Sequence, residues 1–260
     1  MRKATTYSSL PSNLSIGERF ALAAEAGLDG LQIPSFKSQA EAEAAGQAAA
    51  DNGLQVSSVM GGTHWKLPLS STNEEVRVSG VEGIRHALRV AKWAETDCVL
   101  VVPGVVDEDT SYQAAYELAG KSIRELVPLA EELGVIMALE NVWNKFLLSP
   151  LETRDFIDGF DSPMVQAYFD VGNILLYGYP HHWVEALGKR IARVHIKDFN
   201  TTSRQFVAVL SGDVDFPRVI NSLRGVGYDG WLTSELAPYS QFPKLFVHET
   251  AAHLQAIIDC

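Results

Sequence analysis

Residues 135–140 read VIMALE, an apolar run of strand length that ends in a glutamate, and runs of this kind recur along the whole chain. Most of them lack polar alternation, which is expected of strands buried on both faces of a parallel sheet. The chain is therefore expected to fold around a parallel sheet of eight strands. The predicted strands span 4–9, 30–35, 54–60, 98–102, 135–140, 165–170, 192–198 and 230–235.

Between the predicted strands lie helix signals with defined starting points. Ser15 and Glu18 have the spacing of a capping box, in which each side chain accepts a hydrogen bond from the other residue's backbone N–H. Ser149 and Glu152 have the same spacing, and Pro150 stands at the first helical position. A helix is therefore expected to begin at each of these serines.

The longest helical pattern covers 112–133 and stops at Gly134. Its apolar residues recur at intervals of three and four, which predicts one face packed against the sheet. Pro128 falls inside this pattern and lacks a backbone N–H, so it is expected to kink or split the helix.

Eight strand–helix pairs in 260 residues average about 32 residues each, close to the size of a βαβ step. Right-handed crossovers would make all the strands parallel. An open doubly wound sheet and a closed (β/α)₈ barrel are both compatible with this order. The length, the eight pairs and the lack of a Gly-x-Gly-x-x-Gly after the first strand favour the barrel. No interdomain linker is visible, so we predict an α/β fold in which 1–260 form a single TIM-barrel domain.

The composition is that of a globular protein with net negative charge. Lys and Arg number 21, Asp and Glu 32, giving a formal charge of −11, and apolar residues make up 47%. This balance excludes collagen, coiled coils and disorder, and it argues against binding nucleic acid. No stretch approaches the about 18 apolar residues of a membrane span, and the N-terminal segment has no apolar signal core. We therefore expect a cytoplasmic protein without a nucleic-acid or membrane partner.

The two cysteines, Cys98 and Cys260, are too sparse for a disulfide framework and form no zinc motif. Cys98 opens an apolar run and is expected to behave as a small buried hydrophobe. Cys260 is the last residue and is expected to be a free terminal thiol.

Four late strands carry a metal-type side chain at or near their ends: Glu140, Asp170, His195 and Glu235. Barrel geometry would bring these strand ends to one rim. A carboxylate at the end of an apolar strand is costly unless it is paired or metal-bound, and three carboxylates together would repel one another. A divalent cation resolves both problems. The mostly oxygen donor set suits Mn²⁺, Mg²⁺ or Co²⁺ better than structural Zn²⁺.

The segments around these residues carry a resemblance that extends over nearly the whole chain. LENVWNKFLLSP (139–150), YFDVGN (168–173), RVHIKDF (193–199) and SELAPY (234–239) look like the xylose-isomerase-like sugar isomerase/epimerase superfamily. Within it, the chain is most similar to ketose 3-epimerases of the L-ribulose, L-xylulose-5-phosphate and tagatose type. HWKLPLSSTNEEVR (64–77) and VVPGVV (101–106) resemble the same group.

The resemblance implies an enzyme that holds one divalent cation, with Mn²⁺ as the first choice. It places the four metal ligands on Glu140, Asp170, His195 and Glu235, and the acid/base pair on the two glutamates. The implied reaction is epimerisation or isomerisation of a ketose or ketose phosphate by proton abstraction next to the carbonyl, through a metal-stabilised enediolate. Relatives of this kind imply a homodimer or homotetramer.

Residues that follow the strand ends are candidates for contacting the substrate. Asn173 stands where similar free-ketohexose epimerases often carry His, and the Arg that these enzymes place just after the ligand His has its first counterpart here at Arg204. Both departures put a free ketohexose substrate in doubt. Lys197 is expected to polarise or orient the substrate, with a salt-bridged rim pair as the competing interpretation. The predicted substrate-binding residues are His64, Trp65, Asn141, Asn144, Asn173, Lys197, Asp198 and Arg204.

Three other functions remain open at the level of sequence. An inosose-dehydratase-type lyase would use the same scaffold and the same first proton abstraction. A relative of apurinic-site endonucleases would need several additional histidines to bind zinc ions, whereas only His64 and His195 are expected at strand ends. A non-catalytic sugar-binding barrel is disfavoured because all four ligands are present. A substrate phosphate would have to bind near the loop LSGDVDF (210–216) and Arg204, where no basic cradle is evident.

Overall fold

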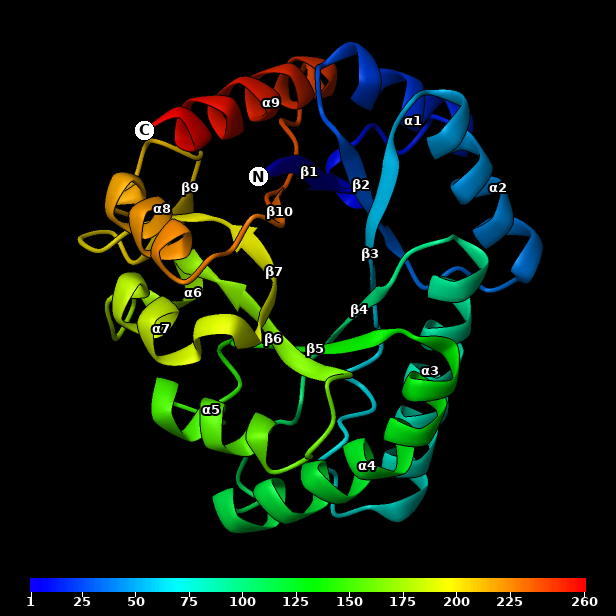
Figure 1. Cartoon of the computed structure of the whole chain (residues 1–260), viewed down its shortest axis with the longest axis vertical. Helices are drawn as coiled ribbons and strands as arrows, with labels where there is room; N and C mark the ends of the chain where they lie inside the picture. Colours follow the sequence, from blue (N-terminus) through cyan, green and yellow to red (C-terminus); the bar gives the residue numbers. More distant parts are fainter.

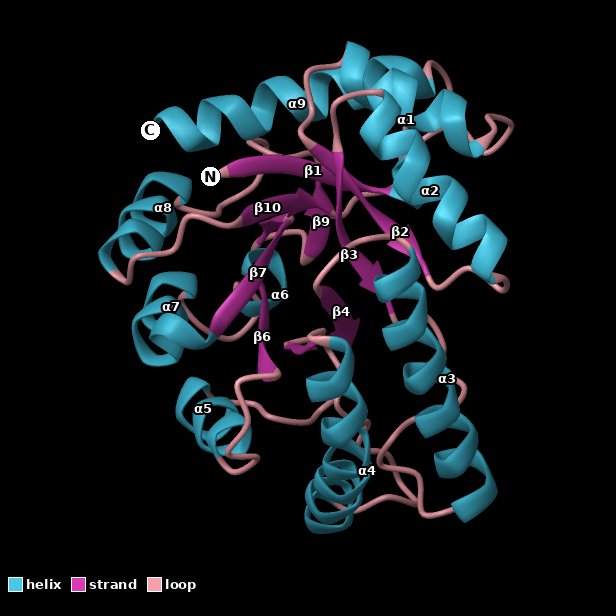
Figure 2. Cartoon of the chain, turned by 45° about the vertical axis from the view of Figure 1, so that its right-hand side comes forward, coloured by secondary structure: helices cyan, strands magenta, loops and turns pink.

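The computed structural model describes all 260 residues and confirms the predicted (β/α)₈ barrel. Eight parallel strands close in the order β1-β10-β7-β6-β5-β4-β3-β2, and the helices surround them (Figures 1 and 2). The barrel strands are β1 (Arg2–Thr6), β2 (Gly30–Pro34), β3 (Gln55–Met60), β4 (Cys98–Val101), β5 (Ile136–Glu140), β6 (Val165–Asp170), β7 (Ile191–Ile196) and β10 (Trp231–Ser234).

The helices bury their apolar faces against the outside of this barrel. None of them is long and apolar enough to cross a bilayer. They are α1 (Ile16–Glu25), α2 (Gln39–Asp51), α3 (Glu74–Trp93), α4 (Tyr112–Leu133), α5 (Pro150–Asp158), α6 (Val171–Ile174), α7 (Pro180–Leu187), α8 (Phe216–Gly225) and α9 (Pro243–Asp259), with 3₁₀ turns at Tyr7–Ser9 and Gly188–Arg190.

Two strand predictions were wrong in their extent. The predicted first strand of 4–9 ends at Thr6, and Tyr7–Ser9 form a 3₁₀ turn. The predicted strand of 192–198 ends at Ile196, after which β8 (Asp198–Asn200) pairs antiparallel with β9 (Gln205–Val207) outside the barrel. The sequence pattern did not predict this hairpin, because strands of three residues are too short to show a period.

The helix signals were largely right. Ser15 and Glu18 form the predicted capping box. Ser149 accepts the N–H of Glu152 and Pro150 is at the helix start, as predicted. The second hydrogen bond of that capping box, from the Ser149 N–H to the Glu152 carboxylate, is absent. This carboxylate accepts the N–H of Leu148 and the hydroxyl of Tyr112 instead.

Helix α4 runs from Tyr112 to Leu133, so the split that was one of the two expected effects of Pro128 does not occur. It ends at Gly134, whose φ of 66° is the left-handed conformation typical of a helix C-terminus. Its buried face, which includes Ala119, Ile123 and Leu126, packs against the core. Tertiary packing of an amphipathic face supplies most of the stability of a protein helix, so one missing N–H does not end it.

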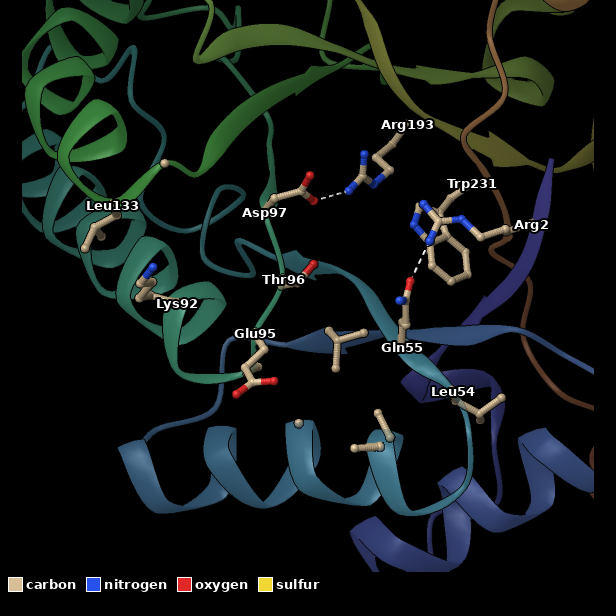
Figure 3. A pocket seen from close by; sticks show the side chains of 16 residues that line it. Arg2, Leu54, Gln55, Lys92, Glu95, Thr96, Asp97, Leu133, Arg193 and Trp231 are labelled. Carbon is tan, nitrogen blue, oxygen red and sulfur yellow. Dashed lines mark hydrogen bonds and ion pairs between the residues drawn. The ribbon is translucent and has the colours of Figure 1, made fainter.

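The base of the barrel is closed by polar side chains. Arg193 points inward from β7, donates to the carbonyls of Ser57 and Ala192, and pairs with Asp97 (Figure 3). Arg2 lies 4.1 Å from the ring centre of Trp231. A cavity of about 770 Å³ adjoins these groups, and none of the predicted site residues lines it. In barrel enzymes the chemistry lies at the opposite, carboxyl-terminal end of the strands, so we interpret this end as structural.

The two cysteines lie in contrasting environments. Cys98 is fully buried in β4, and burial raises the pKa of its thiol to about 11, whereas Cys260 is exposed.

Only the thiolate reacts with disulfide reagents. We therefore predict that Ellman's reagent at pH 8 titrates one thiol per folded chain and a second after denaturation. The Cys260→Ser variant should show none while folded; a reactive thiol in that folded variant would contradict the placement of Cys98.

Candidate active site

Four acidic and imidazole side chains meet at the carboxyl end of the barrel. One ligand atom from each of Glu140, Asp170, His195 and Glu235 lies within 4.8 Å of the others. Glu140 and Asp170 are the last residues of β5 and β6, and His195 is the last but one of β7. Glu235 directly follows β10, and its backbone N–H donates to the carbonyl of Ile196. The predicted convergence of these strand ends is thus present in the structure.

His195 is the centre of this cluster. Its Nδ1 lies 2.9 Å from a Glu140 oxygen, 3.1 Å from a Glu235 oxygen and 3.8 Å from Asp170 Oδ2. Its Nε2 faces the barrel interior, 2.9 Å from Oε1 of Gln32. The imidazole is fully buried, so Nδ1 is the nitrogen that it presents to anything held among the carboxylates.

Lys197 follows His195 and brings a positive charge to the cluster. Its ammonium lies 2.6 Å from Glu235 and 3.0 Å from Asp170. The approach depends on Gly172, because a Cβ there would lie 2.7 Å from Cβ of Lys197. Lys197 is therefore salt-bridged, and its partners are two of the predicted metal ligands; its contact with the substrate stays a prediction.

The ionisable groups of the cluster shift one another's pKa values. Burial raises the pKa of Glu140, and the nearby His195 offsets only part of this effect. Burial acts in the same direction on Glu235, but His195 and Lys197 outweigh it and lower the pKa of that carboxyl. For His195, burial opposes the charged form, yet the two glutamates raise its pKa to about 9. Glu140 and Glu235 contact the same His195 nitrogen, yet their pKa values are shifted in opposite directions.

The donor set fits a hard divalent cation. Three carboxylates and one imidazole nitrogen offer mainly oxygen ligands, as Mn²⁺ and Mg²⁺ prefer. Asp170 is fully buried, and its Oδ2 has no hydrogen-bond partner, although the Lys197 ammonium lies 3.0 Å away outside hydrogen-bond geometry. A buried carboxylate oxygen without a hydrogen bond is costly, so its place within the cluster is the observation that favours a cation.

A family model described as the xylose isomerase-like TIM barrel matches residues 20–257. The chain belongs to this family. An uncharacterized protein of Methanocaldococcus jannaschii is 30% identical over 174 residues, which cover 64% of this chain and 59% of that protein. L-ribulose-5-phosphate 3-epimerase UlaE of Escherichia coli is 28% identical over 188 residues, 70% of this chain and 65% of the relative. The chain thus matches less than two thirds of the length of each of these relatives.

Among solved structures, a D-tagatose 3-epimerase-like protein superposes with a TM-score of 0.85. The alignment covers 100% of this chain and 98% of the other at 22% identity. At that identity the likeness establishes the shared fold.

In this xylose isomerase-like barrel, the predicted asparagines hydrogen-bond to backbone groups at the rim. Asn141 exchanges two hydrogen bonds with the backbone of Asp170, and Asn173 donates to the Asn141 carbonyl. Asn144 donates to the carbonyl of Gly104 and accepts the N–H of Phe146. Asn141 therefore holds the end of β6, and with it Asp170, against the end of β5. Substrate contact by the three asparagines stays a prediction.

Asp198 and Arg204 lie in the segment after β7. The buried Asp198 carboxylate accepts the N–H groups of Phe199, Gly212 and Val214, which ties the 208–214 segment to β8. A Cβ at Gly212 would lie 2.3 Å from this carboxylate, so only glycine fits. Arg204 is exposed in the turn between β8 and β9 and makes no hydrogen bond or ion pair. The structure thus gives Asp198 an anchoring role and shows no contact between Arg204 and the cluster.

His64 and Trp65 follow β3, and His64 lies close enough to Glu235 for that carboxylate to act on its pKa. Burial lowers the pKa of His64, and the Glu235 carboxylate partly offsets this effect. His64 is half-buried with an unpartnered Nδ1, and its ring packs edge to face with Trp65, which is 57% exposed. Substrate contact by His64 and Trp65 stays a prediction.

Two contacts that the structure places beside the cluster were not predicted from the sequence. Gln32 contacts His195; as the one polar side chain within GLQIP of β2 it carried a detectable signal. Trp143 stacks on Phe206 with ring centres 4.9 Å apart, and Phe206 lies 5.5 Å from the Lys197 ammonium. This aromatic stack depends on the β8–β9 hairpin, which the sequence pattern did not show.

We predict that the chain binds one Mn²⁺ and that Asp170→Asn abolishes tight binding while the fold is kept. The amide can still accept the N–H of Asn173, but the negative charge of the Asp170 carboxylate is lost. Loss of a residue that only contacts a metal ligand weakens metal binding about 10- to 100-fold. Calorimetric titration should show a larger loss of Mn²⁺ affinity for Asp170→Asn. Glu108→Gln, at an exposed loop position, is the control and should bind as the parent does. If Asp170→Asn bound Mn²⁺ as tightly as the parent, the cation would not bind at this site.

Proposed function

We propose that this chain is a divalent-metal-dependent epimerase or isomerase of a ketose or ketose phosphate. One observation carries the proposal: Glu140 and Glu235, from strands three steps apart around the barrel, approach the same His195 nitrogen within 2.9 and 3.1 Å. Two carboxylates that reach one point from different directions can serve opposite faces of a planar intermediate. The similarity to a protein named L-ribulose-5-phosphate 3-epimerase supports the same class.

The cation would be held by Glu140, Asp170, His195 and Glu235, with Mn²⁺ as the first choice, Mg²⁺ or Co²⁺ next and Zn²⁺ less suited. When bound, such an ion polarises a carbonyl and stabilises negative charge that develops on its oxygen. The chain itself supplies the proton transfers.

The reaction needs a base and an acid on either side of the substrate carbon. One glutamate removes the proton next to the ketone, and the electron pair of that C–H bond becomes the double bond of an enediolate. The other glutamate returns a proton to the opposite face, which inverts the carbon. Glu235, with 27% of its side chain exposed against 5% for Glu140, is the more accessible of the two. Lys197, 2.6 Å from Glu235, holds that carboxylate in place and can donate to a substrate oxygen.

A screen of pentuloses, hexuloses and their phosphates for deuterium incorporation tests this function. The Mn²⁺-loaded protein is incubated with each sugar in D₂O, and the product is read by NMR and mass spectrometry. We expect deuterium at the carbon next to the carbonyl, together with an epimer or isomer. Water loss from a cyclic inosose would point instead to the dehydratase class. Sugar binding by calorimetry with no exchange would point to a non-catalytic binding barrel.

We predict that Glu235→Gln keeps the fold and abolishes deuterium exchange into the substrate identified by the screen. General acid–base catalysis contributes about 10²- to 10⁴-fold, so exchange should fall by at least that factor. Glu108→Gln should exchange as the parent does. If Glu235→Gln incorporated deuterium into the substrate as fast as the parent, Glu235 would not be the base or the acid.

A further inference from the structure

Beneath the metal-ligand cluster the barrel interior is polar, although it is closed to solvent. Gln32, Ser58, Tyr168 and His195 point inward from β2, β3, β6 and β7, and each is at most 1% exposed. Buried polar groups of this kind are costly unless each one finds a partner. Their hydrogen bonds therefore define the arrangement of the interior.

The four groups form a hydrogen-bonded chain whose direction is defined from His195 through Gln32 to Tyr168. His195 Nε2 lies 2.9 Å from Gln32 Oε1, the Gln32 amide nitrogen donates to the Tyr168 oxygen at 3.3 Å, and Tyr168 lies 3.3 Å from the Ser58 hydroxyl. An amide oxygen can only accept, so the His195 nitrogen that faces Gln32 must carry a hydrogen.

This direction decides which nitrogen of His195 is available at the cluster. With a hydrogen on Nε2, the neutral ring carries its lone pair on Nδ1, the atom that faces Glu140 and Glu235. Were the amide reversed, its NH₂ group would face Nε2 and favour the hydrogen on Nδ1, where it would occupy the direction of the cation. The Tyr168 ring, 4.3 Å from the imidazole centre, restricts the ring from turning over.

We propose that Gln32 is a positioning residue, which holds the hydrogen of His195 on Nε2 and so presents Nδ1 as the metal ligand. It acts through His195 and does not touch the cation. The inference rests on the metal site of the proposed function, but it concerns one hydrogen bond and is independent of the substrate and the reaction.

The first test uses the unaltered chain, with Zn²⁺ as a diamagnetic probe. Long-range ¹H–¹⁵N NMR of the loaded protein identifies the protonated nitrogen of His195, whose signals are assigned by their loss in His195→Gln. We expect a hydrogen on Nε2 and a metal-shifted Nδ1. A hydrogen on Nδ1, or binding through Nε2, would overturn the proposal, and neither result depends on turnover.

The second test compares two variants for Mn²⁺ affinity by calorimetric titration. Gln32→Leu removes the acceptor at nearly the same volume and should weaken binding about 10- to 100-fold, as loss of an outer-shell partner does. Gln32→Glu keeps an acceptor at the same place and should retain binding. Equal affinity of the parent and folded Gln32→Leu would overturn the proposal, as would equal losses in both variants, which would indicate a packing effect. Should Gln32→Leu fail to fold, the NMR result decides alone.

Discussion

The structure depends on the electrostatic problem created at one end of an apolar barrel. Three carboxylates end or follow strands whose other residues are mostly buried, and one oxygen of each lies within 4.8 Å of the others. Their mutual repulsion and loss of water must be offset. His195 and Lys197 supply part of the compensation from the same segment of chain, and the proposed cation would supply the rest. The neighbouring contacts, from Asn141 on Asp170 to Gln32 on His195, hold these charges in register.

Strand alternation gives the two ends of the barrel different tasks. Arg193 and His195 are two residues apart on β7, so both point inward. Arg193 lies toward the base, where it bonds to strand carbonyls and Asp97 and closes the barrel. His195 lies toward the opposite rim and joins the carboxylates. One short strand therefore contributes both to the stability of the base and to the candidate chemistry at the top.

The segments after the strands show how a rim is made rigid by residues that look functional. Asp198 stands beside Lys197 in the sequence, yet its carboxylate binds the backbone of the 208–214 segment. Asn144 likewise holds Gly104 and Phe146. Polar residues next to the strand ends that carry the cluster are thus divided between the candidate site and the loops that frame it. Sequence position alone does not distinguish the two uses.

The number of barrel strands, the barrel and the four converging side chains were determined by the sequence, because buried parallel strands are continuous apolar runs and because strand ends of a barrel share one rim. The metal-type residues could be found for the same reason: an ionisable group is conspicuous at the end of an apolar run. Tertiary structure alone decided the rest. The β8–β9 hairpin, the partners of Lys197 and Asp198, and the contact of Gln32 with His195 include residues as far as 163 positions apart. Such pairings leave no local period, since they depend on which side chains the closed sheet brings face to face.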